Sequence, residues 1–128
     1  MIDLAQLRRE PDFVKAALAR RGVLHETVDA IVQLDSEHRR LLQEAEGLRA
    51  QGKDLSRQVG EARRARADDV AGSLSRTSRE VGERERLASE ALVAVAETLR
   101  AQLLMIPNLP SPEVPDGADE SANVEVRR

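Results

Sequence analysis

The chain has 128 residues, of which 34% are charged and 1% are aromatic, and its formal net charge is −3. The absence of cysteine excludes a disulfide framework, a thiolate nucleophile and a cysteine-based metal site. The length allows one domain, and no apolar run approaches the roughly 18 residues of a membrane helix, so we expect a cytoplasmic protein without a membrane partner.

Two short helices are predicted within residues 1–26. Asp3 lies where an N-cap belongs, and Pro11 suits the first turn of a second helix because its missing N–H would be unpaired there anyway. Gly22 supplies a C-terminal stop. Four apolar residues fall on one face of the second helix: Phe13, Val14, Ala17 and Leu18. We expect this face to pack against the base of the long helical hairpin that residues 27–106 are predicted to form.

Residues 27–66 and 69–106 each repeat an apolar residue every three or four positions and meet at a short charged turn. This pattern predicts a long antiparallel two-helix coiled coil, a helical hairpin, with Asp68 or Asp69 capping the second helix. A helix of about 38 residues would extend roughly 57 Å. Because two helices side by side bury little, no closed catalytic pocket and no catalytic residue are expected.

The apolar seam of the hairpin can be assigned residue by residue. On the first helix its steps alternate three and four, through Ile31, Leu34, His38, Leu41, Ala45, Leu48, Gly52, Leu55, Val59 and Ala62. On the second helix it runs through Val70, Leu74, Thr77, Val81, Glu85, Ala88, Leu92, Val95, Leu99, Gln102 and Ile106. Two consecutive steps of four meet at Val81, which predicts a stutter that locally unwinds the supercoil. His38 has only the distant His25 as a companion, so no metal site is expected.

An extended C-terminal tail is predicted for residues 107–128. Three prolines within residues 107–112 end the second helix. Residues 124–126 alternate like the start of a strand, although nothing else in the chain supplies a sheet. The predicted fold class is therefore all-α, with the short helices at the base of the hairpin and the tail after it.

Charge is distributed unevenly along the hairpin. Residues 49–79, which we call the tip, hold eight basic and four acidic residues and so carry +4, which leaves −7 for the remainder. Seven of these basic residues are candidate RNA-binding residues: Lys53, Arg57, Arg63, Arg64, Arg66, Arg76 and Arg79. Guanidinium groups hold phosphate oxygens well, and the near absence of aromatics argues against base stacking. Recognition of a double-helical RNA through phosphates and 2′-hydroxyls is the expected mode.

A simpler interpretation is that these charges only solvate a coiled coil. The basic residues could pair with Asp54, Glu61 and Glu80 at helical spacing. On that basis the chain could be a structural coiled-coil module that binds protein, or a freestanding RNA-binding protein without an attached enzyme. Ser73, Ser75 and Ser78 have no histidine nearby, so nucleophilic catalysis has no support.

Motifs at both ends of the chain resemble those of one family. The N-terminal run Met1-Ile2-Asp3-Leu4 leads into Leu7-Arg8-Arg9-Glu10-Pro11 and then Ala19-Arg20-Arg21-Gly22. The C-terminal runs are Ile106-Pro107-Asn108-Leu109-Pro110 and Asn123-Val124-Glu125-Val126-Arg127-Arg128. In their order and spacing these runs resemble the N-terminal region of bacterial seryl-tRNA synthetases, over all 128 residues.

The resemblance implies a role in tRNA recognition. Members of this family are class II ligases that use ATP and Mg²⁺ to join serine to its tRNA. Residues 1–106 would be the tRNA-binding arm, which recognises the long variable arm and the elbow of tRNA(Ser) and, in some organisms, selenocysteine tRNA. Residues 107–128 would be a linker and the first residues of the catalytic domain of a homodimeric enzyme.

The sequence departs from the family pattern in two respects. The class II motifs for ATP and serine do not occur in these 128 residues, so we expect no cofactor and no ligase activity from this chain alone. The turn at residues 63–66 is rich in arginine, whereas similar proteins often have lysines and a glycine there.

Overall fold

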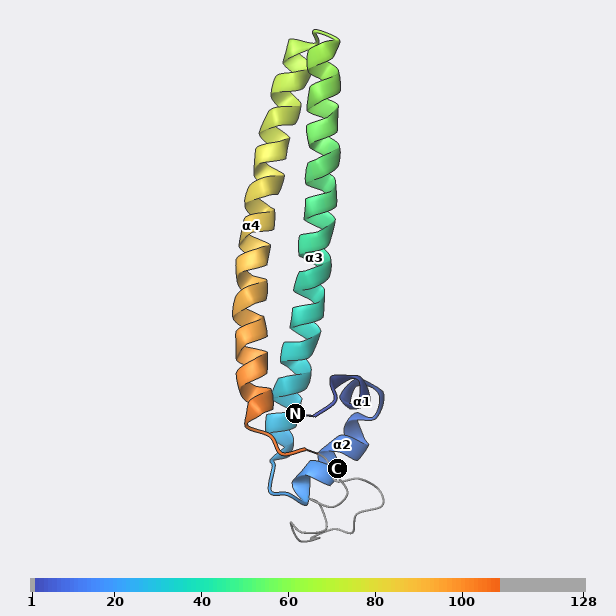
Figure 1. Cartoon of the computed structure of the whole chain (residues 1–128), viewed down its shortest axis with the longest axis vertical. Coiled ribbons are helices and arrows are strands. Elements are labelled where there is room, and N and C mark those ends of the chain that lie inside the picture. The colour runs from blue at the N-terminus through green and yellow to red at the C-terminus, as the bar shows by residue number, and fades with distance from the viewer. Residues whose placement is uncertain (1, 109–128) are drawn as a thin grey trace, which may run out of the picture. The chain divides into compact units, whose positions relative to one another are not determined.

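Four helices make up the computed structural model, which describes residues 2–108 (Figure 1). They are α1 (Leu4–Arg9), α2 (Pro11–Ala19), α3 (His25–Arg64) and α4 (Asp68–Leu104). No residue between 2 and 108 lies in a strand, so the all-α prediction is confirmed. Apart from residues 107 and 108, the predicted tail, with its strand-like residues 124–126, lies outside the described residues. None of the four helices has the length and apolarity needed to cross a bilayer.

The described residues form two compact units. The base unit contains residues 2–35 and 99–108, and the hairpin unit contains residues 36–98. The long helices α3 and α4 therefore contribute to both units. Each unit has its own apolar core.

The two predicted N-terminal helices are confirmed, together with the residues that begin and end them. The backbone N–H of Ala5 donates to the Asp3 carboxylate at 2.9 Å, which caps α1. Pro11 is the first residue of α2. Gly22 has a φ of +84°, a left-handed conformation that glycine adopts without steric cost, and it turns the chain toward α3.

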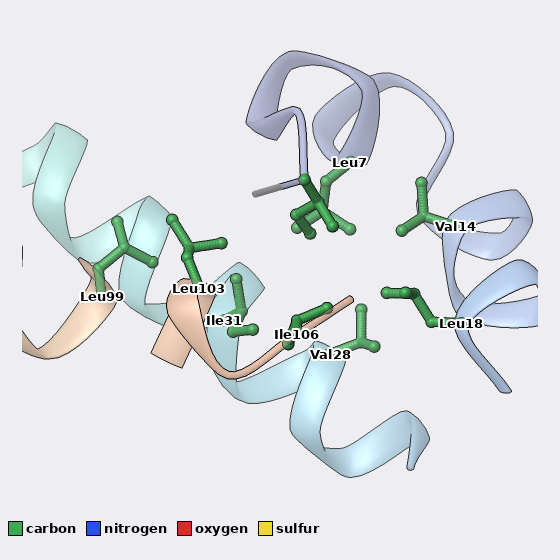
Figure 2. Close-up of a cluster of buried hydrophobic side chains, with 9 residues drawn as sticks. Leu7, Val14, Leu18, Val28, Ile31, Leu99, Leu103 and Ile106 are labelled. Carbon is green, nitrogen blue, oxygen red and sulfur yellow. The ribbon is translucent and has the colours of Figure 1, made fainter. Parts of the chain in front are cut away.

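The core of the base unit joins all four helices. Its buried side chains are Ile2, Leu7, Val14, Leu18, Val28, Ile31, Leu99, Leu103 and Ile106. Figure 2 shows Leu7, Val14 and Leu18 pointing toward residues of α3 and the end of α4. The prediction that the short helices pack at the base of the hairpin is confirmed. The assignment of Phe13 to this face is wrong: its side chain is 51% exposed, because it lies about 120° around α2 from the midpoint between Val14 and Leu18.

Ion pairs connect the short helices to α3. The Arg8 guanidinium donates to both carboxylate oxygens of Asp35, at 2.7 and 2.6 Å. The hydrogen bonds to Asp35 raise the pKa of Arg8 above its usual range. Because Asp35 is only 3% exposed, this bidentate pair also satisfies a buried carboxylate. On α2, Lys15 Nζ lies 2.7 Å from an Asp29 carboxylate oxygen.

In the hairpin unit, α3 and α4 pack along the predicted seam except near the turn. The buried core residues here are Ala45, Leu48, Leu55, Val81 and Ala88, with Leu74 packed against them. Two further observations place residue 52 beside residue 81 and residue 49 beside residue 85. A Cβ added at Gly52 would lie 4.0 Å from Val81 Cγ1, and Arg49 Nε lies 2.9 Å from Glu85 Oε2. The helices are therefore antiparallel, as expected.

The predicted seam of α4 is wrong near the turn. Val70 is 53% exposed and Thr77 is exposed, whereas Ala71 is 5% exposed and Ser78 is half-buried. With Ala71 and Ser78 as the inward residues, the steps toward Val81 alternate three and four without interruption. The burial pattern therefore removes the predicted stutter at Val81. Two consecutive steps of four occur instead at Leu99, because the next core residue is Leu103 and not the predicted Gln102, which is half-buried.

The helix ends differ slightly from their predicted positions. α3 begins at His25 and ends at Arg64, two residues earlier than predicted at each end. α4 begins at Asp68 and ends at Leu104. Ala67 occupies the N-cap position, since its carbonyl accepts the Ala71 N–H at 2.8 Å. Neither Asp68 nor Asp69 is the cap, and both lie in the first turn, where negative charge is favourable to the helix dipole.

Replacement of Leu99 by alanine should lower the free energy of unfolding by about 2–5 kcal/mol, because the side chain is 6% exposed in the base core. Leu104→Ala is the matched control on the same helix, since Leu104 is 63% exposed and should lose less than about 0.5 kcal/mol. Urea unfolding followed by circular dichroism measures both. Equal losses would contradict the assigned core.

Candidate nucleic-acid interface

The seven candidate RNA-binding residues all lie in the hairpin unit and are all exposed. α3 carries Lys53, Arg57, Arg63 and Arg64, the turn carries Arg66, and α4 carries Arg76 and Arg79. The hairpin brings the two sets together, because the turn between Arg64 and Asp68 reverses the chain (Figure 1). Charges that are up to 26 positions apart in the sequence thus share one end of the unit.

Arg57 is the one candidate that is engaged in ion pairs. Its guanidinium lies 2.6 Å from an Asp54 carboxylate oxygen and 2.5 Å from one of Glu61. The hydrogen bond from Arg57, with a second from Gln58 at 2.6 Å, holds the pKa of Asp54 below its usual range. Asp54 therefore remains ionised at neutral pH and competes with any phosphate for Arg57. The solvated-surface interpretation describes this residue well.

The other six candidates differ from Arg57. Within residues 2–108 none of them has an ion pair or a side-chain hydrogen bond with a protein group. Glu80, the third acid considered as a partner, also pairs with none of them in this part of the chain. Their positive charge is thus uncompensated locally and available to a polyanion.

Two of these arginines lie beside glycines of their own helices, at a distance where a Cβ would make only an ordinary van der Waals contact. A Cβ added at Gly60 would lie 3.5 Å from Arg64 Nη1, and one added at Gly72 would lie 4.0 Å from Arg76 Nη1. Each arginine follows its glycine by four residues, the spacing that places two side chains on one helix face. The guanidinium groups therefore lie back along their own helices.

Arg66 occupies a strained position in the turn. Its φ is +58°, the only positive value at a non-glycine residue between positions 2 and 108. The Ala67 N–H donates to Ala62 O at 2.9 Å, and the Arg66 N–H donates to Arg63 O at 3.1 Å. These two bonds form a Schellman motif, whose left-handed position is usually glycine. An arginine there keeps a cation at the turn at a cost in backbone strain.

A groove near the turn contains residues that the sequence did not indicate as candidates. It has a volume of about 360 Å³ and is lined by Ser56, Val59 and Arg63 of α3 and by Ser75, Ser78 and Arg79 of α4. The three serines were missed because a serine on a helix surface carries no signal by itself. For Ser75 and Ser78, the position beside the seam follows only from the corrected register of α4.

Metal-ligating side chains are not grouped on this surface in the part of the chain that the structure describes. Among the described residues no group of three or more histidine, cysteine, aspartate or glutamate side chains could hold a metal ion. His38 is half-buried in the seam, and His25 is the exposed first residue of α3. The polar groups that line the groove are guanidinium and hydroxyl groups, which offer positive charge and hydrogen bonds.

Comparison with known proteins identifies a family. The sequence model described as the seryl-tRNA synthetase N-terminal domain matches residues 1–110. The serine–tRNA ligase of Thermotoga neapolitana is 39% identical over 128 residues, which cover 100% of this chain and 30% of that protein. The serine–tRNA ligase of Roseiflexus sp. is 40% identical over 126 residues, covering 98% of this chain and 29% of that protein. The chain thus spans about 30% of the length of these relatives.

Arg66→Gly should raise the free energy of unfolding by about 1 kcal/mol, because glycine adopts a positive φ without the steric cost that any Cβ imposes. Arg66→Ala is the control, since it removes the same charge but keeps the Cβ, and it should leave the stability within about 0.5 kcal/mol of the parent. Thermal and urea unfolding give both values. A stabilisation shared by the two variants would indicate that charge repulsion, and not strain, is relieved.

Proposed function

Since the chain belongs to the seryl-tRNA synthetase N-terminal domain family, we propose that it is the tRNA-binding arm of a serine–tRNA ligase. Its ligand would be tRNA(Ser), recognised at the long variable arm and the elbow. The observation that carries this proposal is the cluster of six unpaired basic side chains at the tip, within a family whose relatives are named for their action on this tRNA.

The composition of the tip supports contact with the RNA backbone. Phe13, the one aromatic residue of the chain, lies in the base unit, so the hairpin unit offers no stacking platform. Arginines and lysines that contact phosphates and hydroxyls recognise the shape of a helix and not its base sequence. The long variable arm of a tRNA is such a helix.

The remaining assignments belong to the whole ligase. We assign residues 1–106 to the arm, in which α1 and α2 are the short helices and α3 and α4 form the hairpin. Residues 107–128 would be the linker and the first part of the catalytic domain. ATP, Mg²⁺ and seryl transfer belong to that domain, within a homodimeric cytoplasmic enzyme, and selenocysteine tRNA would be a second ligand of the same arm.

A binding titration tests the proposal directly. The chain should bind a tRNA with a long variable arm at least about tenfold more tightly than a tRNA with a short one, because only the former offers the additional helix. Filter binding at several salt concentrations should show the steep dependence expected of phosphate contacts. Equal weak binding to every RNA would instead indicate general charge attraction. An absence of binding at low salt, together with stable protein oligomers, would favour the protein-interaction module.

The triple variant Arg63→Ala/Arg64→Ala/Arg66→Ala should weaken tRNA binding and reduce the slope of log affinity against log salt by up to about three, since each lost phosphate contact removes roughly one. Circular dichroism should be unchanged, because alanine favours helices.

The control for this variant is Arg40→Ala/Arg84→Ala/Arg86→Ala. It removes the same charge from exposed positions outside the tip, two of which are engaged in ion pairs. The control should retain most of the affinity. Equal losses in both triple variants would mean that net charge, and not the cluster near the turn, determines binding.

A further inference from the structure

The groove near the turn differs from the rest of the hairpin surface in the groups that line it. Three serines, two arginines and one valine surround a volume of about 360 Å³: Ser56, Val59, Arg63, Ser75, Ser78 and Arg79. No acidic residue is among these lining residues. The groove is therefore a concave, positively charged surface with several hydroxyl groups.

The charge of the groove is uncompensated. Within residues 2–108 neither Arg63 nor Arg79 forms an ion pair. Arg49 and Arg57, which lie on the same stretch of α3, are each paired with glutamate or aspartate. The two arginines of the groove are thus available to an anionic ligand at no cost in broken ion pairs.

The serine hydroxyls are available as well. Thr77 Oγ1 donates to Ser73 O at 3.2 Å, and Thr98 Oγ1 donates to Ala94 O at 3.0 Å, which is the usual way that a helical hydroxyl is satisfied. The hydroxyls of Ser56, Ser75 and Ser78 make no such bond in the part of the chain that the structure describes. Each can therefore donate one hydrogen bond and accept another at the groove surface.

We infer that this groove holds one strand of an RNA sugar–phosphate backbone, with Arg63 and Arg79 on phosphates and the three serines on 2′-hydroxyls. The inference rests on the proposed tRNA-binding function and names the surface and the chemical groups that it recognises. The alternation of anionic phosphate and neutral hydroxyl along an RNA strand matches the mixture of guanidinium and hydroxyl groups in the groove. Because DNA lacks the 2′-hydroxyl, the serines would make this surface selective for RNA.

The variant Ser56→Ala/Ser75→Ala/Ser78→Ala tests the role of the hydroxyls. It keeps every charge and should keep the helices, since alanine has the higher helix propensity. The probes are an RNA stem of the variable-arm type and the same stem with 2′-fluoro sugars, which stays A-form but lacks the hydroxyl donor. Affinity for the RNA stem should fall about tenfold, a few-fold for each lost hydrogen bond, and affinity for the 2′-fluoro stem should fall less than twofold.

The matched control is Ser36→Ala/Ser73→Ala/Ser89→Ala, which changes three serines on the same two helices away from the groove and should leave both affinities unchanged. An unchanged RNA affinity in the groove variant, or equal losses on the two stems, would overturn the inference while leaving tRNA binding intact. If the parent chain bound neither stem nor tRNA, the proposed function itself would fail.

A second pair of variants tests whether the RNA backbone binds in the groove or elsewhere on the hairpin. Arg79→Ala should weaken binding to the RNA stem at least about fivefold, whereas Arg84→Ala should change it less than twofold. Both arginines are exposed on α4, and neither forms an ion pair within residues 2–108, so the charge change is the same. Equal effects would place the backbone contact outside the groove.

Discussion

Burial of a narrow apolar seam between α3 and α4 is the interaction on which the hairpin unit depends. Leu48, Leu55 and Val81 are 5%, 8% and 3% exposed, and each helix presents an inward residue every three or four positions. Because each helix in this unit packs against only one other, most of the surface of each faces solvent and is under little packing constraint. Charge can therefore be distributed over these surfaces without disturbing the fold, which is what a binding surface for a polyanion requires.

Toward the turn the seam is built from small residues, and this has consequences for both stability and binding. Ala62 and Ala71 bury less apolar area than Leu48 and Leu55, which lie farther from the turn. The two alanines therefore stabilise the hairpin less. The same region concentrates arginines without acidic partners, whose mutual repulsion acts against folding. Asp68 and Asp69 at the start of α4 offset part of it. A bound RNA would remove the remaining repulsion, so binding and stability should rise together.

Most of the fold was predictable, because heptad spacing depends only on residue type and position. The two short helices, the antiparallel hairpin and the α3 seam were correctly predicted from that spacing. The α4 seam near the turn was not, since Val70 is more apolar than Ala71 and only packing shows that the alanine points inward. The candidate site was predictable as a set of basic residues. The sequence did not predict which of these basic residues form ion pairs or which serine hydroxyls lack a hydrogen bond, because both depend on side-chain conformation.

The positions of the acidic residues, and the arginines with which they pair, explain why Arg63 and Arg79 form no ion pair in the described part of the chain. Helical spacing offers Arg63 no acid three or four residues away on either side, so its isolation follows from the sequence. Arg79 has Glu83 four residues ahead, yet Glu83 is held by Arg86 through two hydrogen bonds at 3.1 and 2.5 Å, which lower the pKa of Glu83. Such exposed pairs contribute little to stability. Their larger effect here is local, because a glutamate engaged by Arg86 does not neutralise the arginine that lines the groove.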